Sequence, residues 1–89
     1  MTSHTTRRFR DALHALPQHI RWQASQAYRL FGQNPRHPSL RFKQIHPTRP
    51  IFPVRISADY RALGVRDADE IVWFWIGSHA DYEQLSSRL

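Results

Sequence analysis

The sequence contains no cysteine, only three glycines, and only one lysine among its thirteen basic residues. Without cysteine the chain can form neither disulfides nor thiolate metal sites, which excludes small secreted scaffolds and fits a reducing cytoplasm. Three glycines are too few for a glycine-rich phosphate-binding loop. No apolar run reaches the length of a signal peptide or a membrane span, so we expect a cytoplasmic protein that does not contact membranes.

The length and the apolar content of the chain fit one compact domain. Its 89 residues are 40% hydrophobic and 12% aromatic, and the apolar segments alternate regularly with polar ones. A chain of this length wraps a single core, and this composition argues against global disorder. We therefore expect one domain over residues 1–89, with the polar residues 1–8 flexible.

Acidic residues are scarce except near the C-terminal end. Residues 1–66 carry twelve basic and two acidic side chains, a net charge of +10, whereas residues 67–89 carry one basic and five acidic, a net charge of −4. Twelve of the thirteen cations are arginine, whose planar set of donors matches phosphate and carboxylate oxygens. This charge pattern favours a polyanion or a strongly acidic protein as the partner.

Apolar periodicity predicts helices in the first part of the chain and strands in the second. Two helices are predicted between residues 9 and 31, with a break at Pro17 and a left-handed end at Gly32. After a turn at residues 34–38 the pattern becomes strand-like. The predicted strands are residues 40–46, 52–57, 60–65 and 71–76.

The end of the chain completes the predicted fold. Residues 71–76 are apolar at every position, so we expect a central strand that is covered on both faces. Ser78, with an acid three residues later, predicts the cap of a short last helix. The expected fold class is α+β, an N-terminal helical hairpin packed on a small antiparallel β-sheet of three to four strands, with a short C-terminal helix.

Three residues could together cleave a phosphodiester without a metal, which requires a proton acceptor or donor and cations for the developing charge. Arg55 and Arg61 lie on neighbouring predicted strands, and His79 lies in the first turn of the last helix, where the helix dipole disfavours an imidazolium. We expect these catalytic candidates to converge on one phosphate-sized pocket. The alternative for His79 is a polar surface role. For the arginines the alternatives are a solvated strand face and ion pairs with Asp59 or residues 67–70.

Four further side chains are candidate phosphate or RNA contacts. Cations can hold the phosphates and tyrosines can stack on unpaired bases, although core packing is the alternative for Tyr60. The carboxylates crowd one turn and the histidines lack metal-ligand spacing, so we expect no metal and no other cofactor. The four binding candidates are Lys43, Arg41, Tyr60 and Tyr82.

Three fragments follow one another along the chain: FGQNPRHPSLRFK at residues 31–43, VRISADYRAL at 54–63, and IVWFWIGSHADY at 71–82. As a set they resemble toxins of the RelE/ParE superfamily from bacterial type II toxin–antitoxin systems, with the likeness extending over roughly residues 9–86. The resemblance implies a helical hairpin on a small antiparallel sheet, with the terminal helix near the cleft. It also implies a cognate acidic antitoxin as partner.

Function within this superfamily is divided. Members similar to RelE, HigB, YoeB and YafQ cut mRNA, commonly on the ribosome and without a metal, whereas members similar to ParE inhibit DNA gyrase. The resemblance therefore implies an endoribonuclease (mRNA interferase) that inhibits translation and leaves a 2′,3′-cyclic phosphate. The alternatives are a gyrase inhibitor and a protein that only binds its antitoxin.

The resemblance also assigns roles to individual residues. Arg61 matches the arginine that nucleolytic members place against the scissile phosphate, and His79 matches the histidine of the YafQ-like branch. Arg55 matches a basic strand position. The usual first strand before the helical hairpin is not predicted, because residues 1–8 show no apolar alternation, so we expect the sheet to lack one edge.

Overall fold

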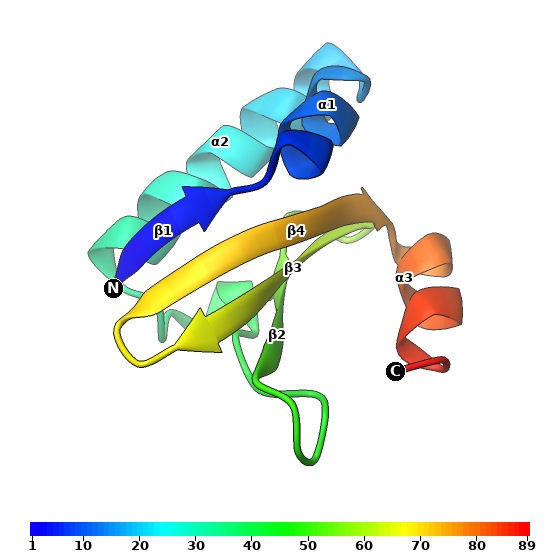
Figure 1. The fold of residues 1–89 in the computed structure, drawn as a ribbon. Coiled ribbons are helices and arrows are strands. Elements are labelled where there is room, and N and C mark those ends of the chain that lie inside the picture. The colour runs from blue at the N-terminus through cyan, green and yellow to red at the C-terminus, as the bar shows by residue number, and fades with distance from the viewer.

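The helices α1 and α2 cover one face of a four-stranded sheet, and α3 lies beside the end of β4 (Figure 1). The computed structural model describes residues 1–89. Its elements are β1 (Thr2–Thr5), α1 (Arg7–His14), α2 (Gln18–Gln33), the 3-10 turn η1 (Pro38–Leu40), β2 (Ile51–Arg55), β3 (Tyr60–Asp67), β4 (Glu70–Ser78) and α3 (His79–Ser86). The strand order is β1-β4-β3-β2, which confirms the α+β class with a helical hairpin on a small sheet.

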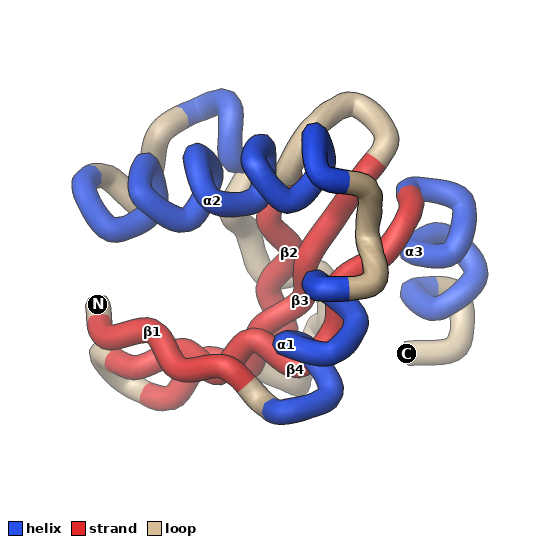
Figure 2. Tube along the Cα trace, turned by 90° about the horizontal axis from the view of Figure 1, so that it is seen from above, coloured by secondary structure: helices blue, strands red, loops and turns tan.

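All neighbouring strands are antiparallel except β1, which runs parallel to β4. Seen from above, α2 runs along one side of the sheet, and α3 follows directly from the end of β4 (Figure 2). No helix combines the length and the apolar character that crossing a membrane requires.

Local capping sets the ends of the first two helices. The side chain of Thr6 accepts a hydrogen bond from the first turn of α1, and α2 begins directly after Pro17. The left-handed end expected at Gly32 is wrong, because α2 continues through it and no glycine has a positive φ. The helix ends instead at Gln33. The next residue, Asn34, is extended with a φ of −152° and precedes Pro35, a residue that disfavours helical geometry before it.

The expectation that the first strand is missing is wrong. Residues Thr2–Thr5 pair in parallel with the start of β4, and the flanking main chain adds hydrogen bonds from Thr2 to Asp69 and from Thr6 to Trp73. The strand lies at the edge of the sheet and carries polar side chains, of which Ser3 accepts a hydrogen bond from the Trp73 indole at 3.4 Å. Because main-chain pairing holds this strand, apolar alternation could not reveal it.

The strand expected at residues 40–46 is also wrong. Its first residue ends η1, and Arg41 follows in a left-handed conformation with a φ of 50°. Phe42 packs edge-on against Phe31 of α2 and stacks on Phe52 of β2. The apolar residues that suggested a strand therefore belong to the core without joining the sheet.

The main core lies between the hairpin and the sheet. Phe31 of α2 meets Trp73 of β4 with ring centroids 5.3 Å apart, and both side chains are buried. β4 is central as expected, but it is not covered on both faces along its whole length. Val72 and its partner Val65 on β3 remain 38% and 40% exposed, because α3 lies only at the other end of the strand.

Gly64 is a position where a side chain would not fit. A Cβ there would lie 2.7 Å from Ile71 and 2.8 Å from Trp73, both buried. We expect Gly64→Ala to lower the free energy of unfolding by about 1–3 kcal/mol, because overpacking a tight core forces side chains to shift. Gly32→Ala is the matched control: nothing lies within 4 Å of its Cβ position, so it should stabilise α2 by roughly 0.5–1 kcal/mol. Denaturant unfolding of both variants checks this, and equal losses would contradict it.

Candidate functional site

Arg55 and Arg61 share one face of the sheet. They are directly opposite each other on β2 and β3, and Arg61 is in turn opposite Gly77 on β4. Ala62, which follows Arg61, belongs to the core under the hairpin, so strand alternation puts Arg61 on the other face. Arg55 ends the edge strand β2 and also borders the space beside α2. On that face the Trp75 ring covers Gly77, where a Cβ would lie only 2.7 Å from the indole.

The guanidinium of Arg61 is held by main-chain oxygens of the loop that joins β2 and β3. Its Nη1 donates to the carbonyls of Ser57 at 2.5 Å and Tyr60 at 2.9 Å. The ion pairs of the protein involve neither Arg61 nor Arg55, so the alternative of pairing with Asp59 or residues 67–70 is wrong. The cation is therefore positioned without being neutralised.

Arg41, Arg55 and Arg61 form an arginine cluster. The pKa of Arg61 lies below its ordinary value because the side chain is partly buried and because the charges of Arg55 and Arg41 repel its own. Tyr82 and Asp59 oppose this shift only as smaller contributions. Three guanidinium groups that lack carboxylate partners create a positive potential that attracts an anion such as phosphate.

The start of α3 is fixed by its cap and by the loop before β3. Ser78 Oγ accepts a hydrogen bond from the Asp81 N–H at 3.1 Å, which confirms the predicted cap. The His79 N–H donates to the Asp59 carbonyl at 2.6 Å. These two bonds hold His79 in the first turn of the helix, next to the loop that positions Arg61.

The two ring nitrogens of His79 differ in their surroundings. Nε2 lies 3.0 Å from the carboxylate of Glu83, one turn further along α3. Nδ1 is buried and has no hydrogen-bond partner. A neutral imidazole that donates from Nε2 to Glu83 keeps Nδ1 as a free proton acceptor. Sequence reasoning missed Glu83, although its spacing of four residues from His79 is the signal of a helical pair.

Tyr82 lies near both the imidazole of His79 and Arg61 of the arginine cluster. Its ring centroid is 6.1 Å from that of His79, and its charge interaction with Arg61 is among those that shift the pKa of each group. Burial raises the pKa of the phenol, and the nearby Arg61 only partly offsets this. The phenol is therefore a hydroxyl donor at neutral pH.

The raised pKa of Tyr82 predicts a loss of stability in alkali. Above about pH 10 the unfolded chain releases the phenol proton before the folded protein does, so the free energy of unfolding falls as the pH rises. Tyr82→Phe should flatten this part of the profile. Denaturant unfolding between about pH 9 and 11 measures the slope, with Tyr28→Phe, an exposed tyrosine, as the control. An unchanged slope in Tyr82→Phe would contradict the expectation.

Two of the predicted binding residues are not brought to the cluster. Lys43 is exposed in the irregular segment after η1 instead of lying on a strand beside Arg55. Tyr60 precedes Arg61 on β3, so alternation places it on the opposite face of the sheet. No group of three or more histidine, aspartate or glutamate side chains gathers where it could hold a metal ion.

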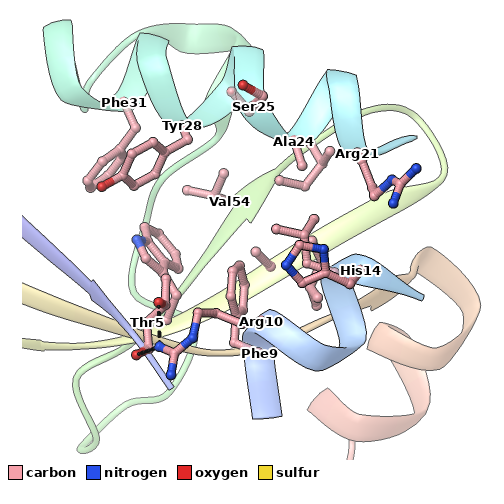
Figure 3. Close-up of a pocket in the computed structure, with 16 residues that line it drawn as sticks. Thr5, Phe9, Arg10, His14, Arg21, Ala24, Ser25, Tyr28, Phe31 and Val54 are labelled. Atoms are coloured by element: carbon pink, nitrogen blue, oxygen red, sulfur yellow. Dashed lines mark hydrogen bonds between the residues drawn. The ribbon is translucent and has the colours of Figure 1, made fainter. Parts of the chain in front are cut away.

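An apolar groove of about 370 Å³ opens on the other side of the molecule, between the hairpin and the sheet (Figure 3). Its walls include Phe9 of α1, Tyr28 of α2 and Val54 of β2. Its polar lining includes Arg10, which donates to the Thr5 carbonyl at 2.7 Å, but no carboxylate. The groove is thus apolar with a basic rim.

The folds of several solved toxin structures are similar to this one. A chain of the RelB–RelE antitoxin–toxin complex from Methanococcus jannaschii is 18% identical with a TM-score of 0.69, covering 92% of this chain and 96% of that one. YafQ from Escherichia coli is 12% identical with a TM-score of 0.69, covering 90% and 94%. At these identities the likeness shows the fold alone.

A chain of the toxin–antitoxin complex RelBE2 from Mycobacterium tuberculosis is 28% identical with a TM-score of 0.61, covering 90% of this chain and 92% of that one. No curated protein sequence matches. Residues 18–84 match a family described as a ParE-like toxin domain. This match spans α2, the strands β2 to β4 and most of α3, and so includes the whole arginine cluster. The chain therefore belongs to the ParE-like toxin family, within the RelE/ParE superfamily of toxins.

Proposed function

We propose that this toxin is a metal-independent endoribonuclease that cleaves mRNA and inhibits translation. The observation that carries the proposal is the arginine cluster without carboxylate partners, next to Tyr82 and to an imidazole with a free nitrogen. Positioned cations stabilise the charge that develops on a phosphate during cleavage, and a histidine supplies general acid–base catalysis.

In the proposed reaction the 2′-hydroxyl of a ribose attacks the adjacent phosphorus. His79 takes the hydroxyl proton at Nδ1, the new P–O2′ bond forms, and the P–O5′ bond breaks. The leaving oxygen takes a proton from Tyr82 or from water, so the products end in a 2′,3′-cyclic phosphate and a 5′-hydroxyl. Arg61 faces the phosphate, and Arg55 and Arg41 hold the strand.

One movement is required, because Nδ1 of His79 is covered in the free protein. The imidazole must turn when RNA binds, which breaks or rotates its contact with Glu83. Such adjustment is common, since catalytic hydrogen bonds often form only in the substrate complex.

Mapping of transcript ends after expression of the protein tests this proposal. Cleavage should leave cyclic phosphate ends that a phosphatase removes only after acid treatment.

The second candidate, inhibition of DNA gyrase, is favoured by the family match to ParE-like toxins. Intact transcripts together with loss of supercoiling by purified gyrase would support gyrase inhibition and exclude the endoribonuclease proposal.

The apolar groove is the proposed docking site of an acidic antitoxin. Its apolar walls and basic rim complement an amphipathic helix with acidic flanks. The similar structures from Methanococcus jannaschii and Mycobacterium tuberculosis were determined as toxin–antitoxin complexes. An acidic protein encoded beside this chain should co-purify with it, and its failure to bind would remove the partner.

A further inference from the structure

A second cavity, of about 550 Å³, opens between α2 and the loop that joins β2 and β3. We call it the Trp22 pocket. Its volume lies in the range of sites that bind small molecules. The residues that matter here are Trp22, Gln23, Gln26, Leu30, Leu40 and Arg55.

Two residues that line this pocket each carry an unsatisfied polar atom. Gln23 Oε1 and Arg55 Nε are both buried and have no hydrogen-bond partner. Most buried polar atoms in native proteins are paired, so an unpaired acceptor and an unpaired donor on two residues that line one cavity require an explanation. Because both atoms are covered in the free protein, the two side chains must rotate to reach a ligand in the pocket. A ligand edge that both donates and accepts would satisfy the pair.

Trp22 is 64% exposed, the largest exposure among the large hydrophobic side chains. It contributes an aromatic surface to a cavity whose other apolar residues include Leu30 and the buried Leu40. An exposed indole beside a cavity is suited to stacking on a flat ring.

Arg55 connects the pocket to the arginine cluster. It lines the cavity, and its charge acts directly on Arg61 across the β2–β3 pair. The pocket and the arginine cluster therefore share Arg55. The base next to a phosphate held by the cluster is accordingly a candidate ligand for this pocket.

We propose that the Trp22 pocket binds one base of the RNA strand next to the scissile phosphate, with the ring stacked on Trp22 and its polar edge paired with Gln23 and Arg55. The inference rests on the nuclease function proposed above. A base fits better than a protein segment, because its flat apolar face and mixed donor and acceptor edge match the indole, the amides and the guanidinium. The cavity would then set the base preference of cleavage.

Binding of an uncleavable strand tests the pocket separately from catalysis. The probe is a short single-stranded RNA with a deoxyribose at the cut position, made in four versions that differ in the flanking base. Trp22→Leu should weaken binding roughly tenfold, within the range that base stacking on an aromatic side chain supplies. Trp22→Phe should stay within about threefold of wild type, and Gln23→Leu should reduce the preference among the four bases.

Gln33→Leu is the matched control, since this glutamine is exposed at the end of α2 and lines neither cavity. Thermal unfolding confirms that the exposed Trp22 variants keep the fold. If the wild-type protein binds the probe, Trp22→Leu weakens that binding, and no RNA is cleaved, the result would support the base-binding pocket and exclude the nuclease function. Wild type that cleaves RNA while Trp22→Leu and Gln23→Leu bind all four probes unchanged would overturn the pocket alone. Weaker antitoxin binding with unchanged probe binding would assign the cavity to a protein partner and overturn the proposal.

Discussion

Replacing Arg61 with alanine should reduce RNA cleavage about 100- to 1,000-fold, the loss typical when one donor to a developing negative charge is removed. Arg61 is the member of the arginine cluster that the loop carbonyls hold in place and that both other arginines approach. Without Arg61 the cluster keeps the charges of Arg41 and Arg55 but loses the guanidinium that main-chain hydrogen bonds hold in place. Single-turnover cleavage of a defined RNA measures the effect.

Two further variants separate catalysis from folding. Arg61 also binds main-chain oxygens, so the alanine variant is expected to lose stability as well. Arg61→Lys keeps the charge but not the planar set of donors, and it should retain the fold while still losing most of the activity. Arg66→Ala is the matched control on the same strand, because Arg66 donates to the Ala68 carbonyl and lies outside the cluster. Equal activity of the Arg61 and Arg66 variants would exclude the proposed phosphate site.

Replacing His79 with asparagine should reduce the cleavage rate about 100- to 10,000-fold, the usual range for loss of a general acid or base. Asparagine is polar and fits the first turn of a helix, so the cap and the hydrogen bond of the His79 N–H to Asp59 should survive. The loss should appear in kcat at saturating RNA, because the imidazole acts on the reacting hydroxyl and the arginines hold the strand.

Controls distinguish the imidazole from its surroundings. Glu83→Gln removes the charge beside Nε2 but preserves a hydrogen-bond partner, so we expect a loss of roughly tenfold or less. His19→Asn, in the exposed first turn of α2, controls for removal of a histidine far from the site. Full activity of His79→Asn together with loss of activity in Arg61→Ala would assign proton transfer to another group, such as Tyr82, whose ring centroid lies 6.1 Å from that of His79.

The hairpin and the sheet could be predicted to different extents. The helices α1 and α2 each bury an apolar stripe, and such a stripe repeats at a period visible in the sequence. β1 was missed because an edge strand of polar residues is held by main-chain bonds that every sequence can make. The strand expected at residues 40–46 failed for the opposite reason, since Phe42 is apolar through contacts with Phe31 and Phe52 rather than through pairing.

The sequence could predict which residue types make up the candidate site, but not how those residues are arranged in space. Arg55 and Arg61 could be assigned to neighbouring strands, but only the register shows them directly opposite. Lys43 and Tyr60 have suitable side chains but do not join the cluster. Lys43 lies in an irregular segment instead of the expected strand, and Tyr60 lies on the opposite face of β3 from Arg61. Trp22 and Gln23 were not considered, since on a helix an exposed tryptophan and a glutamine give no local sign of a cavity.

By itself the sequence determined the α+β class, the cap of the last helix at Ser78 and the excess of arginine that calls for an anionic partner. These properties follow from side-chain periodicity, local hydrogen bonding and composition, which act over a few residues or over the chain as a whole. Only the tertiary structure decided that Arg41 joins Arg55 and Arg61, that Glu83 occupies one nitrogen of His79, and that a pocket opens beside Arg55. Such contacts depend on strand register, on loop path and on which side chains remain unpaired after packing, and these are settled by the whole chain at once.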